Sequence, residues 1–118
     1  MNRAATEDAH AESDRVFKAL ADPTRRRILD LLLRRPRATG QIAARFPGVT
    51  RFAVMKHLKV LEAAGLVVTA RRGRRRMNHL NAAPLQRVYR RWIRPYEARW
   101  ADALLDLKET AEREDTDE

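Results

Sequence analysis

The sequence predicts a mainly α-helical chain with one small β-hairpin, and three observations support this fold class. Two short segments with helical patterns, 39–46 and 51–64, are joined by a Pro-Gly pair, which favours a tight turn. Thr39 is expected to cap the first of these helices. A valine-rich apolar run follows at 66–71, as expected for a strand. A glycine flanked by arginines then leads into a returning strand at 75–80. Helix, turn, helix and ribbon in this order predict a winged helix-turn-helix, a shape commonly used to place a helix in the DNA major groove.

The segments on either side of this motif are also predicted to be helical. A short first helix is expected to begin at Ser13. A second helix begins after Asp22, whose carboxylate can accept from the free amides of the next turn, and it ends near Arg35, just before a proline. A last helical region starts at Pro84 and is interrupted by Pro95. We therefore expect this region to form either two helices or one kinked helix.

The composition excludes some chemistry and points to a class of partner. The 118 residues suit one domain with a modest core, and the absence of cysteine excludes disulfides and thiolate metal sites. The net charge of +9 is uneven, because residues 1–14 carry −3, residues 109–118 carry −5 and residues 15–108 hold +17. A basic body between acidic ends is typical of a protein with a polyanionic partner. A basic surface that serves only solubility is the alternative, and charge alone does not separate the two.

The same patterns predict how the chain is divided. Residues 1–12 are polar and are expected to form a disordered tail, residues 13–108 the winged domain, and residues 109–118 an acidic tail. No apolar run approaches the roughly 18 residues needed to span a bilayer. The N-terminus has no apolar signal-peptide core. A cytoplasmic protein with no membrane partner is therefore expected.

The segment 51–64 is the candidate recognition helix. Thr50 is predicted to cap its start, and Gly65 to end it in the left-handed conformation. Apolar residues at i, i+4 and i+7 from Val54 predict a buried face. The candidates for DNA contact on and beside the opposite face are Thr50, Arg51, Phe52, Met55, Lys56, His57 and Lys59.

The first two turns of this helix would reach base edges. Arg51 and Lys56 could pair with guanine O6 and N7, and Met55 or Phe52 could contact a thymine methyl group. The alternative is an ordinary solvated basic face, which the neighbouring turn and ribbon make less attractive.

The candidate wing is the hairpin tip with its second strand, because five of the six residues 71–76 are arginine. Its predicted DNA contacts are Arg72, Arg74, Arg75 and Arg76. Guanidinium groups on a thin ribbon suit phosphates or a narrow minor groove. They also keep an exposed strand edge from pairing with another strand, and both roles can hold at once.

A further basic cluster begins the second helix, at Arg25, Arg26 and Arg27. Cations at the positive end of a helix are unfavourable on dipole grounds unless an anion compensates them. The cluster is interpreted either as solvated or as a phosphate contact.

Neither a metal site nor an active site is expected. The three histidines, His10, His57 and His79, form no pair at helical spacing, and no thiol assists them. No Ser/His/Asp set, carboxylate pair or glycine-rich phosphate loop stands out. The chain is therefore predicted to be no enzyme and to need no cofactor.

The last helical region carries an apolar stripe rich in aromatic residues, at spacings of three and four. A chain this small has little core for the stripe to fill, and aromatic residues are enriched at interfaces. We expect a homodimer through the first and last helices, formed by Val16, Phe17, Leu20, Leu85, Val88, Trp92, Tyr96, Trp100, Leu104 and Leu107. An intramolecular core is the alternative, and an effector pocket could coexist with the dimer.

Three motifs occur in order within residues 13–108: ADPTRRRIL from Ala21, HLKVLEAAGLV from His57 and GRRR from Gly73. Together they resemble the ArsR family of bacterial winged-helix regulators. The resemblance implies a homodimeric transcriptional repressor that leaves its operator when an effector binds.

Two departures from the family pattern matter. Metal-sensing members carry cysteines before the turn, or His and Asp ligands in the last helix, whereas residues 39–46 have no thiol and the last helices no histidine. The chain therefore resembles a metal-independent branch, and its effector, a small molecule or a protein, stays open. Met55 stands where relatives often have serine, so the family's contact there does not carry over.

The leading functional prediction is a sequence-specific, DNA-binding transcriptional regulator, most simply a repressor on an inverted-repeat operator. The first alternative is an architectural protein that binds DNA without sequence preference, with almost wholly electrostatic affinity. The second is a protein-interaction module that uses the aromatic stripe and no longer binds DNA.

Overall fold

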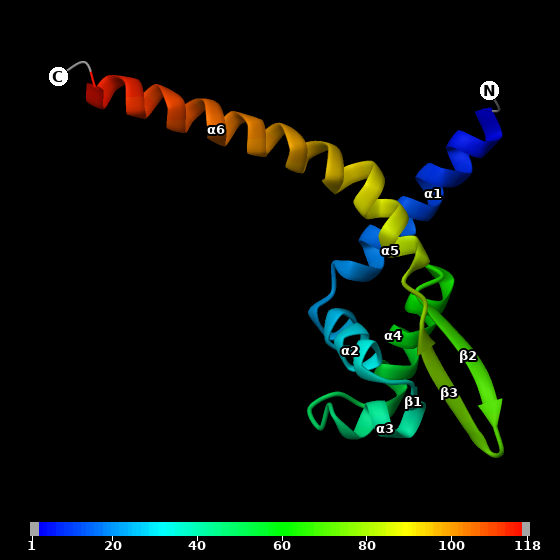
Figure 1. Ribbon diagram of the computed structural model, residues 1–118. Helices are drawn as coiled ribbons and strands as arrows, with labels where there is room; N and C mark the ends of the chain where they lie inside the picture. The colour runs from blue at the N-terminus through cyan, green and yellow to red at the C-terminus, as the bar shows by residue number, and fades with distance from the viewer. Residues whose placement is uncertain (1–2, 117–118) are drawn as a thin grey trace. The chain divides into compact units, whose positions relative to one another are not determined.

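A computed structural model describes residues 3–116, with side chains from 6 to 115 (Figure 1). Its elements are α1 Arg3–Leu20, α2 Pro23–Arg34, β1 Arg37–Ala38, α3 Thr39–Ala44, α4 Arg51–Ala63, β2 Val67–Arg72, β3 Arg75–Leu80, α5 Ala83–Val88, a π-helical turn Tyr89–Ile93 and α6 Arg94–Thr116. The chain divides into two compact units, up to Gln86 and from Arg87 onward. The predicted winged helix-turn-helix is confirmed and lies in the first unit. None of the helices in the described part is both long and apolar enough to cross a bilayer.

The ends of α2 and α4 are fixed by the residues that predicted them. Asp22 accepts a hydrogen bond from the backbone amide of Arg25 at 3.1 Å, and Thr50 Oγ1 accepts one from the amide of Ala53 at 3.1 Å. Each oxygen satisfies an amide that has no partner within the helix. Gly65 follows α4 with φ +76°, which L-residues rarely adopt. The amide of Leu66 then returns to the carbonyl of Leu61 at 2.9 Å, closing the helix end.

The wing is two strands of a three-stranded antiparallel sheet in the order β1-β3-β2. Strands β2 and β3 pair from Val67 opposite Leu80 to Arg72 opposite Arg75. This register leaves a two-residue tip, where Gly73 has φ +66°. Strand β1 pairs with the middle of β3 and was not predicted, because two residues are too few to show an alternating pattern.

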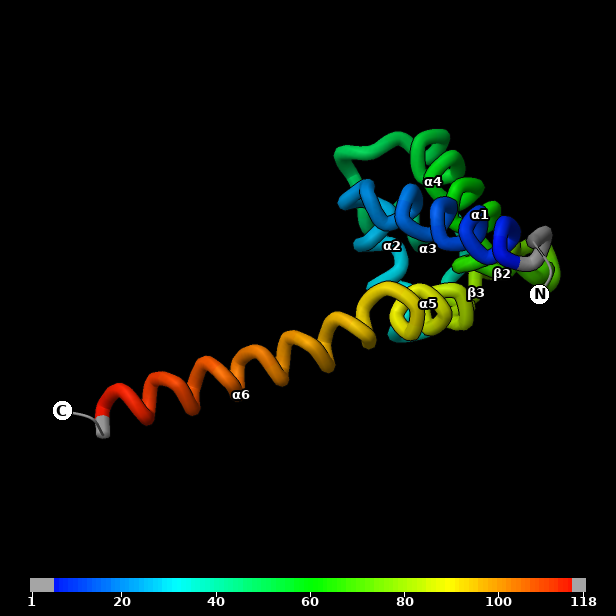
Figure 2. The backbone as a smooth tube through the Cα atoms, turned by 90° about the horizontal axis from the view of Figure 1, so that it is seen from above, coloured from blue at the N-terminus to red at the C-terminus, as the bar shows by residue number. Residues whose placement is uncertain are grey.

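The core of the first unit lies where α1, α2 and α4 meet one another and where α3 packs on α4. Figure 2 shows α1 running alongside α2 and α4. The side chains that fill this core are almost fully buried: Val16, Ala19, Ile28, Leu32, Ile42, Val54, Leu58, Leu61 and Leu66. Since three buried residues of α4 belong to this core, its opposite side must face outward.

Two predicted helix starts need correction. Helix α1 begins at Arg3 rather than Ser13, so the stretch expected to be a disordered tail is helical from Arg3 onward. The alanine and glutamate residues of this stretch favour a helix, although the stretch has no apolar stripe from which a helix could be predicted. Helix α3 is capped at Ala38, not at Thr39, and Gln41 Oε1 accepts from the Ala38 amide at 2.9 Å. Residues 1–2 and 117–118 of the two predicted tails lie outside the described residues.

The predicted interruption of the last helical region takes the form of a π-helical turn. The amide of Arg94 donates to the carbonyl of Tyr89, five residues back. Pro95 has no amide hydrogen for the carbonyl four residues before it, and a wider turn accommodates this gap in the ladder. Within the second unit, the Tyr89 hydroxyl also donates to Glu97 Oε2 at 2.6 Å, and this bond raises the pKa of Tyr89.

Candidate nucleic-acid interface

The outward side of α4 carries the residues predicted to contact DNA bases. Arg51, Phe52, Met55, Lys56 and Lys59 are all exposed. The Lys56 ammonium lies over the Phe52 ring, 4.7 Å from its centroid. This cation–π contact holds a positive charge against an apolar surface on the first two turns of the helix. The helix therefore offers donors for guanine and apolar groups for thymine on one face.

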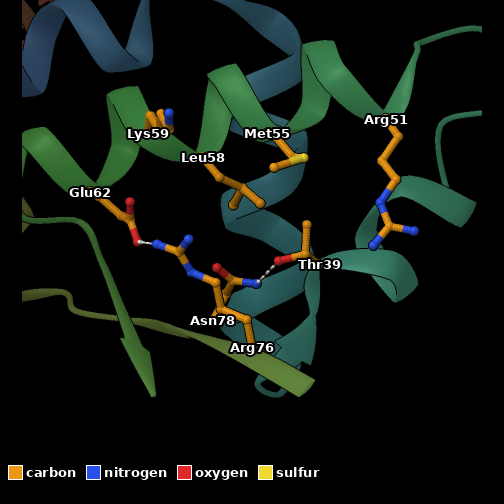
Figure 3. Close-up of a pocket in the computed structure, with 8 residues that line it drawn as sticks. All are labelled: Thr39, Arg51, Met55, Leu58, Lys59, Glu62, Arg76 and Asn78. Carbon is orange, nitrogen blue, oxygen red and sulfur yellow. Dashed lines mark hydrogen bonds and ion pairs between the residues drawn. The ribbon is translucent and has the colours of Figure 1, made fainter. Parts of the chain in front are cut away.

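A pocket lies between α4 and β3 (Figure 3). Its lining combines cationic, polar and apolar side chains of three elements: Thr39, Arg51, Met55, Leu58, Lys59, Glu62, Arg76 and Asn78. The pocket connects the predicted recognition helix with the base of the wing, so these two predicted contact surfaces lie next to each other.

The wing arginines fall into two groups that the sequence does not distinguish. Arg72, Arg74 and Arg75 are exposed, and no ion pair within residues 3–116 involves them. Arg76 instead donates to Glu62 Oε1 of α4 at 2.6 Å, as Figure 3 shows. Arg76 therefore joins the wing to the recognition helix, whereas the other three are available for phosphates.

A buried amide fixes the base of the wing. Asn78 is 1% exposed, and its side-chain amide donates to the Arg37 carbonyl and to Thr39 Oγ1, both at 3.1 Å. These bonds tie β3 to β1 and to the start of α3. Arg37 is also buried, and its Nε donates to the Leu31 carbonyl at 3.3 Å. Burial lowers the pKa of Arg37, with a smaller effect from nearby arginines. The sequence gives no local signal for either residue.

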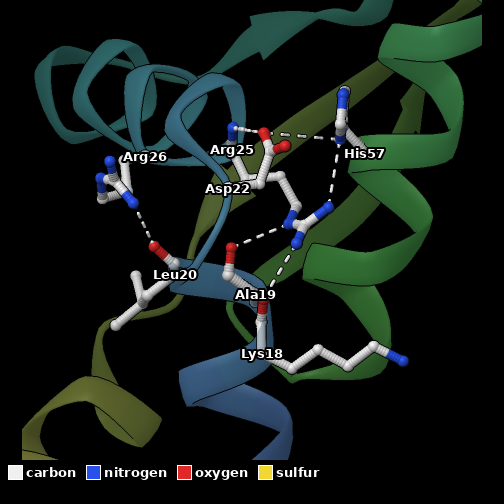
Figure 4. A network of polar contacts seen from close by, with 7 residues as sticks. All are labelled: Lys18, Ala19, Leu20, Asp22, Arg25, Arg26 and His57. Carbon is white, nitrogen blue, oxygen red and sulfur yellow. Dashed lines mark hydrogen bonds and ion pairs between the residues drawn. The ribbon is translucent and has the colours of Figure 1, made fainter.

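Two of the three arginines in the basic cluster at the start of α2 have a structural role that the sequence did not indicate. Arg25 donates to the carbonyls of Ala19 and Lys18 at 2.8 and 2.9 Å, and Arg26 donates to that of Leu20 at 2.6 Å (Figure 4). These are the last carbonyls of α1, which have no partner within that helix. Arg25 and Arg26 thus close the end of α1, and Arg27 is exposed.

The same cluster reaches the recognition helix. Nη1 of Arg25 lies 3.3 Å from Nδ1 of His57, and Oδ2 of Asp22 lies 3.9 Å from that nitrogen. The pKa of Asp22 is lowered, first by the hydrogen bond from the Arg25 amide and also by the positive charge of Arg25. His57, predicted as a DNA contact, is therefore partly engaged inside the protein.

Known proteins with similar sequences are transcriptional regulators. A helix-turn-helix domain family model matches residues 20–70. The uncharacterized HTH-type transcriptional regulator YuzN of Bacillus subtilis is 40% identical over 90 residues, which cover 71% of this chain and 98% of YuzN. The transcriptional repressor SdpR of the same organism is 39% identical over 71 residues, or 60% of this chain and 78% of SdpR.

Solved structures identify the family. An ArsR-like transcriptional regulator from Rhodococcus sp. RHA1 is 36% identical, with a TM-score of 0.67 over 86% of this chain and 94% of that one. The chain belongs to the ArsR family of helix-turn-helix transcriptional regulators. A homodimeric winged helix-turn-helix DNA-binding domain from Mycobacterium bovis, a possible ArsR-family regulator, is 34% identical, with a TM-score of 0.60 over 73% of this chain and 78% of that one. The family predicted from the three motifs is therefore confirmed.

The residues predicted to form the dimer interface of this ArsR-family chain divide by exposure. Tyr96, Trp100, Leu104 and Leu107, together with Phe17, are exposed, whereas Leu20, Leu85 and Trp92 are half-buried. Val16 and Val88 are buried within the chain itself at 0% and 4% exposure. These two are a correction, because a side chain already covered by its own chain has no surface left for a partner.

The ArsR-family chain shows no metal-binding cluster in its described part. No group of three or more His, Cys, Asp or Glu side chains is placed to hold an ion there. His10 is exposed on α1 and His79 is exposed on β3, whereas His57 faces Arg25.

Proposed function

We propose that this regulator represses transcription as a homodimer on an inverted-repeat operator. One observation supports the proposal: side chains of α4 and of β3, the second strand of the wing, line a single pocket, so the exposed face of α4 lies beside the wing that carries the exposed arginines. Helix-turn-helix proteins use such a surface by laying the second helix in the major groove.

Some of these side chains read the base sequence, and others position the protein on the DNA backbone. Arg51 and Lys56 donate to guanine, while Met55 and Phe52 contact thymine methyl groups. Arg72, Arg74 and Arg75 bind phosphates, which sets the position of the protein but reads no sequence. Lys59 binds a phosphate at the edge of the groove. Thr50 accepts an internal hydrogen bond, so its hydroxyl hydrogen is free to donate to a phosphate.

The homodimer forms on the exposed apolar side of α6. Tyr96, Trp100 and Leu107 are 59%, 68% and 67% exposed, which is unfavourable for large apolar side chains in water. A second copy of the chain covers them, as the homodimeric Mycobacterium bovis relative suggests. Two-fold symmetry of the protein then requires an inverted repeat in the DNA.

The regulator responds to a small molecule or protein rather than to a metal. Zinc, nickel and copper prefer thiolate and imidazole ligands, and this chain has no thiol and only three separated histidines. The proposed direction of control is repression, since the relative SdpR is a transcriptional repressor. With DNA as its partner the protein acts in the cytoplasm, and we assign it no catalytic step.

Binding measurements on two sets of variants test this division. Arg51→Ala and Lys56→Ala should each weaken operator binding by about 1–3 kcal/mol while leaving random DNA almost unaffected. Arg74→Ala should weaken both and lower the salt slope by about 0.9 per lost phosphate contact, or about 1.8 for the two protomers of the dimer. If the wing variants changed sequence preference and the α4 variants did not, the wing would read the bases and α4 would bind phosphates, the reverse of the roles assigned here.

The alternative is an architectural protein whose affinity is the same for every sequence. Selection from a random duplex library separates the two, because only a sequence-specific regulator enriches one site. A library that stays unenriched while binding is tight and strongly salt-dependent would favour the architectural function.

A further inference from the structure

We propose that Arg25 is a positioning residue for DNA binding. It holds His57 as the neutral tautomer that carries its proton on Nε2, so that the Nε2–H donates to an operator phosphate. The inference rests on the proposed function and adds one contact and its supporting residue to the same site. The guanidinium group of Arg25 connects the end of α1 to the recognition helix.

The guanidinium of Arg25 is fixed before it meets His57. Nε donates to the carbonyl of Ala19 at 2.8 Å, and Nη2 donates to that of Lys18 at 2.9 Å. Two bonds to consecutive carbonyls set the plane of the group, because the five donors of arginine have a rigid fork geometry. Nη1 is therefore aimed at Nδ1 of His57, 3.3 Å away (Figure 4).

This geometry selects one tautomer. Arginine can only donate, so Nδ1 of His57 must accept and carry no proton. The competing tautomer would place a proton on Nδ1 facing the Arg25 donor, and its compensating acceptor, Asp22 Oδ2, is 3.9 Å away, too far for a hydrogen bond. The proton of the neutral ring is thus on Nε2.

The Nε2 side of His57 is the side that the network leaves free. Figure 4 shows this nitrogen on the far side of the ring from Asp22 and Arg25. The side chain is 22% exposed and lies on α4, directly after the exposed Lys56. Side chains and backbone groups that flank a recognition helix commonly donate to phosphates. A neutral imidazole makes such a contact without adding charge.

The contact between neutral His57 and a phosphate can be distinguished from a purely structural role of His57 by the salt dependence of operator binding. Counterion release depends on the number of cationic contacts, so losing the His57 contact should lower affinity with no change in salt slope. Glutamine can place its amide nitrogen near the Nε2 position, whereas asparagine is too short. His57→Gln should therefore retain more operator affinity than His57→Asn.

Arg26 supplies a matched control for Arg25. Both arginines donate to the end of α1, but the Arg26 side chain donates to the Leu20 carbonyl. Arg25→Lys and Arg26→Lys both keep the positive charge but replace the planar guanidinium group with a single ammonium group. We expect Arg25→Lys to weaken operator binding about fourfold, because an equal mixture of tautomers halves the binding-competent fraction of His57 in each protomer of the dimer. Arg26→Lys should change operator binding less than about twofold.

The experiment combines fluorescence anisotropy on operator DNA with nitrogen NMR of the histidine rings in the full chain. In the wild type, His57 should show a protonated Nε2 and an unprotonated Nδ1, and in Arg25→Lys a mixture of tautomers. Thermal unfolding by circular dichroism shows that each variant is folded at the assay temperature. Equal losses in Arg25→Lys and Arg26→Lys, or a wild-type Nδ1–H tautomer, would overturn this inference alone. Wild-type protein that binds no DNA would overturn the proposed function with it.

Discussion

The ion pair between Arg76 and Glu62 predicts that arginines of one wing will behave differently. Arg76 is held against α4 at 2.6 Å, whereas Arg74 at the tip is exposed and has no ion pair within residues 3–116. Replacing Arg74 with alanine removes a phosphate contact. Replacing Arg76 removes mainly the link between wing and helix. Replacing Glu62 with glutamine should free Arg76 to bind a phosphate.

The size of the effect follows from counterion release. Each phosphate contact contributes about 0.9 to the slope of log affinity against log salt, so a roughly fourfold rise in salt weakens binding about 3.5-fold per contact. In a homodimer each substitution occurs twice, so Arg74→Ala should make the salt slope shallower by about 1.8. Arg76→Ala should change the slope much less, and Glu62→Gln should make it steeper by up to the same amount. The Arg76 side chain is 53% exposed, so the pair itself contributes only about 0.2–1 kcal/mol to folding. All three variants should therefore remain folded.

Fluorescence anisotropy on one random duplex, repeated over a salt series, measures the three slopes directly. A random duplex is suitable because phosphate contacts are independent of sequence. Equal slopes for Arg74→Ala and Arg76→Ala, with no increase for Glu62→Gln, would show that the Glu62 pair does not withhold Arg76 from DNA.

Three further predictions concern other parts of the molecule. Trp100→Ala should leave the fold of the single chain intact, because the side chain is 68% exposed, but should shift the dimer toward monomer in analytical ultracentrifugation; an unchanged dimer would remove Trp100 from the interface. Gly65→Ala should destabilise the protein by about 1–2 kcal/mol in urea unfolding, since Gly65 has φ +76° and the added Cβ meets only an ordinary contact at 3.5 Å from Pro84. Gly48→Ala is the control, and an equal loss there would refute the backbone argument. Operator binding should be unchanged by a chelator or by micromolar zinc, nickel or copper, and a tenfold loss restored by chelator would return the protein to the metal sensors.

The helix ends were predictable because their causes are local. Asp22 and Thr50 each cap an amide three residues ahead, and Gly65 sits where only a residue tolerant of positive φ fits. Such short-range chemistry is visible in the order of the residues. The two strands of the wing were predictable for the same reason, from a valine-rich run and a glycine turn.

The contacts that connect the elements could not be predicted. Arg25 and His57 are 32 positions apart, and Arg76 and Glu62 are 14 apart. No periodicity marks such pairs, so Arg25 and Arg76 looked like other surface arginines. For a similar reason, the spacing of Val16 indicated an apolar face but not whether the chain itself or a partner covers it.

Selection from a random duplex library, followed by affinity measurements at one fixed salt concentration, tests the central claim most directly. The account predicts enrichment of one inverted repeat. It also predicts that Arg51→Ala and Lys56→Ala narrow the affinity ratio between that site and random DNA, while Arg74→Ala leaves the ratio unchanged. No enriched sequence, or a ratio that depends on the wing and not on α4, would contradict it.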